Sequence, residues 1–342
     1  MTSATAKLVL ASLLAMLSIW LSTASSLAQG GDGLPLPGQV YRFEQLAGDT
    51  RKISVLDILQ DQQGFLWFAG SDGLYRYDGY RTTVFRHDPD NPNSLSGNWV
   101  QDVLEDSQGN LWAGTRTGLN RFDPQTGQFT RYQHQADDPH SLSENRISAL
   151  LEDSRGHLWV GTRNGLNRLD PETGQFVSYT HNPDNSNSLS HNAVSDLAQD
   201  TQGALWVATQ GGVSRLVLAA DDSPQFTRYQ HNPDDPASLS NDFAVSILAD
   251  SRDNIWIGTW GGGLNYLAAA ERDKTTPRFV HYQNQPDNPY SLGDNIVSKI
   301  FEDSDGALWI GTFRNGLQLF DRRQQTFRRF PREEANPNSL SG

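Results

Sequence analysis

"GHLWVGTRNGLNRLD" occupies residues 156–170, and "GNLWAGTRTGLNRFD" at residues 109–123 is nearly the same text. Each stretch has an apolar run around a tryptophan, a Gly-Thr step, a two-residue turn and a second run of alternating character. Alternating apolar and polar residues bounded by turn residues predict β-strands. The chain therefore repeats one unit made of strands, and this repeat decides its fold.

One tryptophan in each copy gives the register of the repeat. The spacing between successive copies runs from 45 to 53 residues. Each copy holds four short segments rich in Val, Ile, Leu, Trp and Tyr, and we find no sustained helical period after the first 28 residues. A unit of four short antiparallel strands at this period predicts a β-propeller blade, with the tryptophan buried between blades. The six structural tryptophans are Trp67, Trp112, Trp159, Trp206, Trp256 and Trp309.

The predicted class is all-β, a propeller of four-stranded antiparallel blades. Residues 40–46 resemble a fourth strand, and residues 336–342 resemble the segment that opens each copy. We therefore expect residues 40–342 to hold six complete blades and the orphan outer strand of a seventh, whose other strands would lie beyond Gly342. A complete seventh blade would close the ring by pairing the exposed edges of its neighbours. Because this blade is incomplete, we expect a gap or strained closure between copies six and one. The blades are expected at about residues 40–87, 98–134, 145–181, 192–231, 242–284 and 295–330.

The first residues of the chain differ from the repeat. Lys7 precedes an apolar run at residues 8–21, and small residues stand at Ala28 and two positions before it. This pattern predicts a signal peptide over residues 1–28, followed by a linker at residues 29–39. An uncleaved anchor is the alternative, although the apolar run is short for a membrane span of about 20 residues. The sequence thus predicts a periplasmic or other extracytoplasmic protein.

Composition narrows the function classes. The 342 residues include no cysteine, and the formal net charge is −13. The lack of cysteine excludes disulfides, thiolate metal sites and cysteine nucleophiles. An acidic surface repels nucleic acids and anionic membranes, so we expect neither as a partner.

Two sets of polar residues recur at fixed places in the repeat. An aspartate opens the hairpin between the first and second strands of each copy, as in Asp106 followed by Gly109. Turn chemistry explains this pattern better than calcium binding, because one hairpin offers too few ligands. Four histidines share the end of the fourth strand but belong to different blades, so we predict no metal site and no cofactor. They are His87, His134, His181 and His231.

The loop between the second and third strands changes from copy to copy, whereas the strands hardly change. In a propeller these loops surround the mouth of the central channel. Arginine binds carboxylate or sulfate groups bidentately, and aromatic faces stack on sugar rings or peptide groups. One alternative is that the arginines pair with crossing-segment aspartates such as Asp90 or Asp137; another is that a second propeller docks on this face. The candidate ligand-binding residues are Arg116, Arg163, Trp260, Phe313 and Arg314.

The hairpins between the third and fourth strands lie on the opposite face, and two of them are long. These are residues 217–225 and 267–278. Docking of a partner or a second copy is one interpretation. A tolerated surface insertion is the other.

The repeat also resembles a known family. Residues 58–80, residues 86–96 and the recurring pattern LWxGTxxGLNRxD resemble two-component regulator propeller repeats, over about residues 40–342. The resemblance implies the periplasmic sensor region of a bacterial hybrid histidine kinase or diguanylate cyclase receptor. It also implies further propeller or sandwich domains and a membrane tether in the same receptor.

We therefore predict a non-catalytic, extracytoplasmic ligand-sensing propeller that binds a carbohydrate or other polar ligand. Its expected partners are further domains of the same receptor and, as one option, a second copy of the chain. A secreted polysaccharide lyase or hydrolase and a pure protein-interaction scaffold are the alternatives. One aligned first-strand position at the channel is small or neutral and offers no acid/base pair, so no catalysis is expected. Its residues are Gln101, Ser148, Ser195, Val245 and Ser298.

Overall fold

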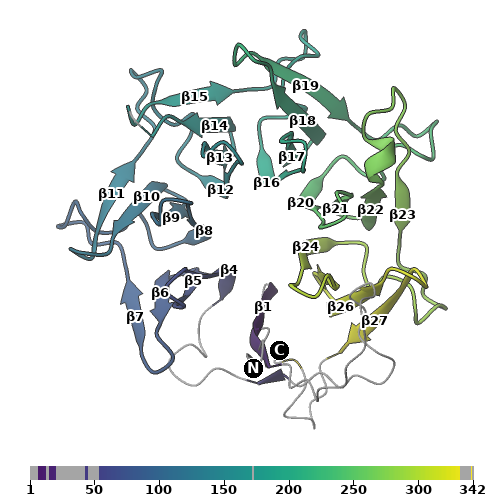
Figure 1. The fold of residues 1–342 in the computed structure, drawn as a ribbon, viewed down its shortest axis with the longest axis horizontal. Helices are drawn as coiled ribbons and strands as arrows, with labels where there is room; N and C mark the ends of the chain where they lie inside the picture. Colours follow the sequence, from purple (N-terminus) through teal and green to yellow (C-terminus); the bar gives the residue numbers. More distant parts are fainter. Residues whose placement is uncertain are drawn as a thin grey trace.

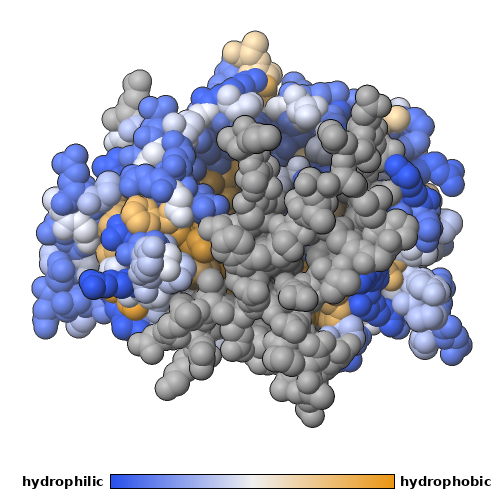
Figure 2. Space-filling model, turned by 60° about the horizontal axis from the view of Figure 1, so that its bottom comes forward, coloured by the Kyte–Doolittle hydropathy of each residue, from blue (hydrophilic) through white to orange (hydrophobic). Residues whose placement is uncertain are grey.

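The computed structural model describes residues 7–12, 15–20, 43–44, 54–171, 173–331 and 340. Six four-stranded antiparallel sheets follow one another along the chain and are arranged around a central axis (Figure 1). The predicted all-β class with six four-stranded blades is thereby confirmed. Within the described residues the single helical element is a 3-10 turn, η2 (Ala269–Glu271), and no helix is long and apolar enough to cross a membrane. The rim of the ring is largely hydrophilic (Figure 2).

Within each blade, four consecutive strands pair in chain order, and the first strand lies nearest the axis. Blade one contains β4 (Val55–Gln60), β5 (Leu66–Gly70), β6 (Gly73–Tyr77) and β7 (Thr82–Phe85). Blade two contains β8 (Val100–Glu105), β9 (Leu111–Thr115), β10 (Gly118–Asp123) and β11 (Gln128–Tyr132). Blade three contains β12 (Ile147–Glu152), β13 (Leu158–Thr162), β14 (Gly165–Leu169) and β15 (Phe176–Tyr179).

The remaining three blades follow the same plan. Blade four contains β16 (Val194–Gln199), β17 (Leu205–Thr209), β18 (Gly212–Leu218) and β19 (Pro224–Tyr229). Blade five contains β20 (Ala244–Ala249), β21 (Ile255–Thr259), β22 (Leu264–Leu267) and β23 (Val280–Tyr282). Blade six contains β24 (Val297–Glu302), β25 (Leu308–Thr312), β26 (Gly316–Asp321) and β27 (Thr326–Phe330).

A small N-terminal sheet lies between the first and last blades. It pairs β1 (Lys7–Ser12), β2 (Ala15–Trp20) and β3 (Phe43–Glu44) in that order, and β1 contacts β4 on one side and β24 on the other (Figure 1). The N-terminal sheet thus occupies the place where we expected a gap. β3 falls within the predicted outer strand, and β1 and β2 fall within the predicted signal peptide. Cleavage after Ala28 stays a prediction.

A hydrogen-bonded aspartate–tryptophan pair recurs in all six blades. The second strand of every blade is buried along its whole length, so each indole N–H needs a buried acceptor. In blade three, Trp159 Nε1 donates to Asp153 Oδ2 at 2.8 Å, while Asp153 Oδ1 accepts the hairpin N–H groups of Arg155 and His157. The same indole bond occurs in all six blades at 2.7–2.9 Å. The recurring aspartate therefore shapes the hairpin and satisfies the tryptophan, as turn chemistry predicts.

The recurring histidines form hydrogen bonds with the segments that cross between blades. Their Nδ1 atoms lie 2.6–2.8 Å from a leucine carbonyl eight residues later, as in His134 with Leu142. In blade five Asn284 takes this role and donates to Leu292. Among the described residues, no group of three or more His, Asp or Glu side chains is arranged to hold a metal ion.

The two long hairpins tie neighbouring blades together. In residues 267–278, the guanidinium of Arg272 is buried and reaches Asp200 of blade four and Asp253 in the first hairpin of blade five. In residues 217–225, Asp222 forms a two-pronged ion pair with Arg168 of blade three. The two interpretations drawn from the sequence, docking of a partner and a tolerated insertion, did not include this intramolecular role. The extra residues of both hairpins contribute contacts between blades.

Candidate functional site

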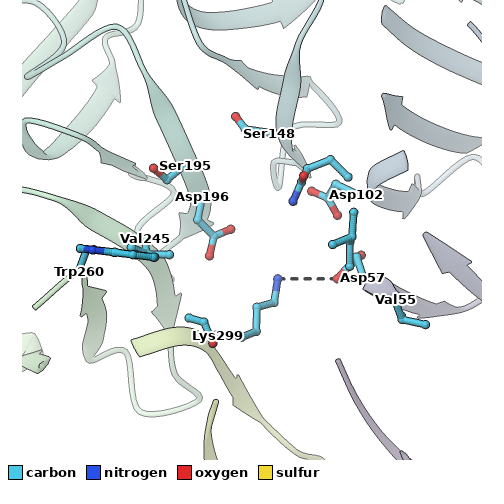
Figure 3. A pocket seen from close by; sticks show the side chains of 12 residues that line it. Val55, Asp57, Asp102, Ser148, Ser195, Asp196, Val245, Trp260 and Lys299 are labelled. Carbon is cyan, nitrogen blue, oxygen red and sulfur yellow. Dashed lines mark ion pairs between the residues drawn. The ribbon is translucent and has the colours of Figure 1, made fainter. Parts of the chain in front are cut away.

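The first strands of all six blades surround a central cavity of about 240 Å³. Its lining combines small hydroxyl side chains with charged groups and a single indole (Figure 3). The lining residues are Val55, Leu56, Asp57, Gln101, Asp102, Ser148, Ser195, Asp196, Val245, Trp260, Ser298 and Lys299.

Each first strand has a bulge near its start, and in blades one, two, four and six two successive positions at the bulge line the cavity. In blade two the pairing register shifts between Val100 and Asp102, which leaves Gln101 as the extra residue. The first strands of the other five blades show the same shift. Because a bulge locally breaks the strict alternation of a strand, Gln101 and Asp102 both line the cavity.

This bulge corrects the prediction for the channel lining. The position predicted to be small or neutral does face the cavity, but in blades one, two, four and six the next position along the strand faces it as well. That second position carries Asp57, Asp102, Asp196 and Lys299. The one position named in the prediction is small or neutral, but the conclusion that the channel offers no acid/base pair left out these four charged side chains.

Neighbouring charges shift the pKa values of two cavity residues, Lys299 and Asp102. Lys299 Nζ lies 3.7 Å from Asp57 Oδ1, and its side chain extends between Asp57 and Asp196 (Figure 3). Burial lowers the pKa of Lys299, but the carboxylates of Asp196, Asp57 and Asp102 outweigh burial and raise that pKa. Burial, followed by repulsion from Asp57, raises the pKa of Asp102 well above its usual range.

The cavity carboxylates also hold neighbouring blades together. Asp102 Oδ2 accepts the backbone N–H of Leu150 in blade three at 2.6 Å, and its Oδ1 accepts that of Val103 at 2.9 Å. Asp196 Oδ2 likewise accepts the N–H of Ile247 in blade five at 2.9 Å. Each of these aspartates therefore satisfies a backbone donor on the next blade, which gives it a structural role.

We expect Asp102→Asn to raise the free energy of unfolding at pH 7, by about 0.5–2 kcal/mol. The folded-state pKa of Asp102 is raised, so its ionised form destabilises the fold above that pKa, and the penalty disappears as the pH falls toward the unfolded value of about 3.9. Asparagine keeps an oxygen for the N–H of Leu150 without the charge, although its amide group no longer accepts the N–H of the adjacent Val103. Urea unfolding at pH 7 and at pH 4 would check this, with the gain confined to pH 7; a loss at pH 7 would contradict it.

The mouth of the cavity is built from one pair of residues per blade. One member directly precedes the first strand, and the other directly follows the second strand. In five blades the backbones of the two members are bonded, as in Arg116 N–H to Trp99 O at 3.1 Å and Trp260 N–H to Phe243 O at 2.8 Å. In blade three, Arg146 and Arg163 directly flank the paired strand residues Ile147 and Thr162. Side chains of both members therefore emerge together at the same face of the ring. We call these the mouth pairs.

The mouth pairs of blades five and six form an apolar wall, defined as Phe243, Trp260, Ile296 and Phe313. The Trp260 ring stacks on Phe243 with centroids 5.8 Å apart and meets Phe313 at 5.5 Å. Trp260 and Phe313 remain 43% and 47% exposed, which is unusual for side chains of this size. Trp260 also lines the cavity, so the apolar wall is continuous with the channel.

The mouth pairs of blades two and three form an arginine cluster, defined as Arg116, Arg146 and Arg163. The Arg116 guanidinium lies over the Trp99 ring at 3.5 Å. Burial lowers the pKa of Arg146, and the positive charges of Arg163 and Arg116 lower it further. Within the described part of the chain, none of the three forms an ion pair, so the alternative pairing with Asp90 or Asp137 is not observed.

The five predicted ligand-binding residues thus fall into two groups. Arg116 and Arg163 belong to blades two and three, and the others belong to blades five and six, on the other side of the ring (Figure 1). Arg314 is exposed beside Phe313, and its backbone N–H donates to Asp294.

Sequence reasoning missed one member of each mouth pair, namely the residue just before the first strand. The sequence did contain a signal for this position, because the residue there also changes from copy to copy. It reads Ser54, Trp99, Arg146, Ala193, Phe243 and Ile296.

The family model described as "Two component regulator propeller" matches residues 94–117, 141–164, 188–211, 238–261 and 291–314. Each matched segment begins in a crossing segment and ends in the loop after the second strand. The chain thus contains five two-component regulator propeller repeats. The repeats correspond to blades two to six, and each includes both members of a mouth pair.

Individual relatives match these repeats over limited lengths. A segment of 43 residues is 42% identical to histidine kinase P4 of Formosa agariphila, which is 13% of this chain and 3% of the kinase. The extracellular domain of the putative one component system BT4673 from B. thetaiotaomicron is 24% identical, with a TM-score of 0.47 over 83% of this chain and 38% of that chain. The chain therefore spans well under two thirds of both relatives.

An enzyme shares the fold. Virginiamycin B lyase from Staphylococcus aureus superimposes with a TM-score of 0.59 over 84% of this chain and 87% of that chain, at 14% identity. At this identity the likeness concerns the architecture alone.

Proposed function

We propose that the chain is the extracytoplasmic, non-catalytic sensing propeller of a bacterial signalling receptor. Two observations support the class: the two-component regulator propeller repeats, and the local similarity to a histidine kinase. The predicted signal peptide over residues 1–28 supports export. The expected partners are further domains of the same receptor or a second copy of the chain, and the charge of −13 argues against nucleic acid.

The observation that carries the proposal is the composition of the mouth. Two large aromatic side chains, Trp260 and Phe313, stay exposed and in contact with each other beside a polar cavity. Exposed aromatic pairs of this kind mark binding sites, since they offer a large apolar face without needing to rearrange. A carbohydrate ring fits such a face, and the hydroxyl-lined cavity below would receive its polar groups. We infer a carbohydrate or other polar ligand.

Trp260→Ala should weaken ligand binding about tenfold or more, because it removes the central ring of the apolar wall. The intact chain would first be applied to an array of neutral and acidic oligosaccharides, and the affinity for the strongest binder would then be measured. Tyr80→Ala is the matched control, since Tyr80 is 93% exposed in a hairpin at the opposite face. Binding to no glycan, or equal affinity in wild type and Trp260→Ala, would reject this proposal.

An enzyme acting within the channel is the second candidate. The raised pKa of Asp102 beside a cavity favours it, since such shifts are common in general acids. Against it, both oxygens of Asp102 already accept backbone N–H groups. Asp102→Asn separates the two functions: a channel enzyme would lose turnover of its polysaccharide, whereas a sensor would keep its affinity at the mouth.

A further inference from the structure

The arginine cluster has a composition that folding alone does not explain. Arg116 follows the second strand of blade two, Arg146 precedes the first strand of blade three, and Arg163 follows the second strand of blade three. The charges of Arg116 and Arg163 are close enough to that of Arg146 to lower its pKa. Glu144 is the acidic group that opposes this effect, so the local charge stays positive.

Holding three guanidinium groups together costs free energy unless an anion joins them. The protein has 40 acidic residues, yet the described part of the chain places none within ion-pair distance of these arginines. Elsewhere buried arginines are paired with carboxylates, Arg272 with three and Arg322 with two. The arginine cluster differs from these arginines in that three neighbouring guanidinium groups have no carboxylate partner among the described residues.

The geometry also preorganises one of the three groups. Arg116 lies on the Trp99 ring, and Trp99 is itself fixed by an Nε1–H bond to Gln101 Oε1 at 3.2 Å. Stacking fixes the plane of a guanidinium while its edge keeps its N–H donors. A planar fork held in this way suits an oxyanion, which accepts two parallel hydrogen bonds.

We propose that Arg116, Arg146 and Arg163 form a binding subsite for an oxyanion group, a sulfate or a carboxylate, carried by the ligand. Its role in sensing rests on the proposed function, but its affinity for an anion does not. The cavity carboxylates Asp57, Asp102 and Asp196 repel an anion from the channel, so the oxyanion stays at the mouth. The apolar wall across the ring would contact the uncharged part of the same ligand.

The test uses the intact chain and inorganic sulfate, titrated calorimetrically against chloride at constant ionic strength. We expect saturable binding, with the dissociation constant raised about ten- to a hundredfold in Arg146→Gln and in Arg163→Gln. Arg155→Gln is the matched control: it makes the same charge change on blade three, in the exposed hairpin between the first and second strands, at the opposite face. Melting curves of each variant would confirm that it is folded. Arg163→Lys keeps the positive charge but loses the planar guanidinium with its paired N–H donors, so it should bind sulfate with intermediate affinity.

A second titration with acetate distinguishes the two oxyanions, since a site for a planar carboxylate should prefer acetate and a site for a tetrahedral group should prefer sulfate. No saturable binding of either ion, or an equal loss in Arg155→Gln, would overturn the subsite. Loss of glycan binding in Trp260→Ala with sulfate binding unaltered would leave both proposals standing. Failure of sulfate and acetate binding with a Trp260-dependent glycan signal would reject the subsite alone.

Discussion

Arg272→Ala should lower the free energy of unfolding by about 3–5 kcal/mol at pH 7. The Arg272 side chain is 4% exposed, and its Nη1 and Nη2 atoms lie 3.2 Å from Asp200 Oδ2 and 2.6 Å from Asp253 Oδ2. Asp200 is completely buried and also accepts the indole N–H of Trp206. Removing the arginine leaves this carboxylate in a low-dielectric site with only Arg215, 3.9 Å away, as a counter-charge.

The pH dependence of the Arg272→Ala effect gives an independent check. The Arg272 hydrogen bond lowers the pKa of Asp253 to about 2. A lowered folded-state pKa contributes stability above the unfolded value of about 3.9, and this contribution is lost as the pH falls to 2. The difference between variant and wild type in urea unfolding should therefore shrink between about pH 4 and pH 2.

Arg252→Ala is the control for this experiment, because Arg252 is exposed in the first hairpin of blade five and pairs with no carboxylate in the described structure. Its effect should stay within about 0.5 kcal/mol. Equal losses in the two variants would show that Arg272 acts only as surface charge.

The repeat made most of the fold predictable. Trp159 and its counterparts stand at one place in every copy, and Asp153 and its counterparts stand six residues earlier. These are local patterns, and six copies of a local pattern remove the ambiguity that a single strand would carry. The four-stranded blade and the structural role of the hairpin aspartate follow from them directly.

Contacts between blades were not predictable in the same way. Arg272 and Asp200 are far apart in sequence, and nothing in either hairpin alone indicates that they meet. The charge in the channel was hidden for another reason. A prediction based on strict alternation assigns one of two successive residues to the cavity, but the first-strand bulge brings both Gln101 and Asp102 there.

One member of each mouth pair could be predicted from the sequence, and the other could not. Comparing the loops after the second strand identified Arg163 and Trp260, because those loops differ between copies while their surroundings do not. Arg146 and Phe243 were missed because they belong to the crossing segment in the sequence. Only the pairing of the adjacent strands, and for Phe243 a backbone bond from Trp260, places them beside the loop. The split into an arginine cluster and an apolar wall then depends on which blades lie across the ring from each other (Figure 1).

Asp250→Asn should also cost about 3–5 kcal/mol, because three kinds of donor converge on this carboxylate. Its side chain is fully buried, and Oδ2 accepts Trp256 Nε1–H at 2.7 Å and Arg322 Nη1–H at 2.5 Å. The hairpin N–H of Asn254 donates to Oδ1 at 2.8 Å. An asparagine can satisfy one side of this arrangement, but its amide N–H groups then face other donors, and among the described residues Arg322 keeps only Glu302, at 2.8 Å, as a counter-charge.

The substitution should also change how the free energy of unfolding depends on pH in the acidic range. Burial raises the pKa of Asp250, but the hydrogen bonds from Arg322, Trp256 and Asn254 outweigh burial and lower it. A lowered folded-state pKa means that the stability Asp250 provides exists above the unfolded pKa of about 3.9 and is lost as the pH falls below it. Thermal unfolding of Asp250→Asn should therefore differ most from wild type at neutral pH and approach it in acid.

Asp106→Asn isolates the contribution of the arginine. Asp106 accepts the same indole bond from Trp112 and the same hairpin bond from Asn110, but the described residues give it no ion pair. We expect a smaller loss there, about 1–3 kcal/mol, since only uncharged donors are left unsatisfied. Equal losses at the two positions would mean that Arg322 adds nothing to the aspartate–tryptophan pair, and that blades five and six are held together by packing instead.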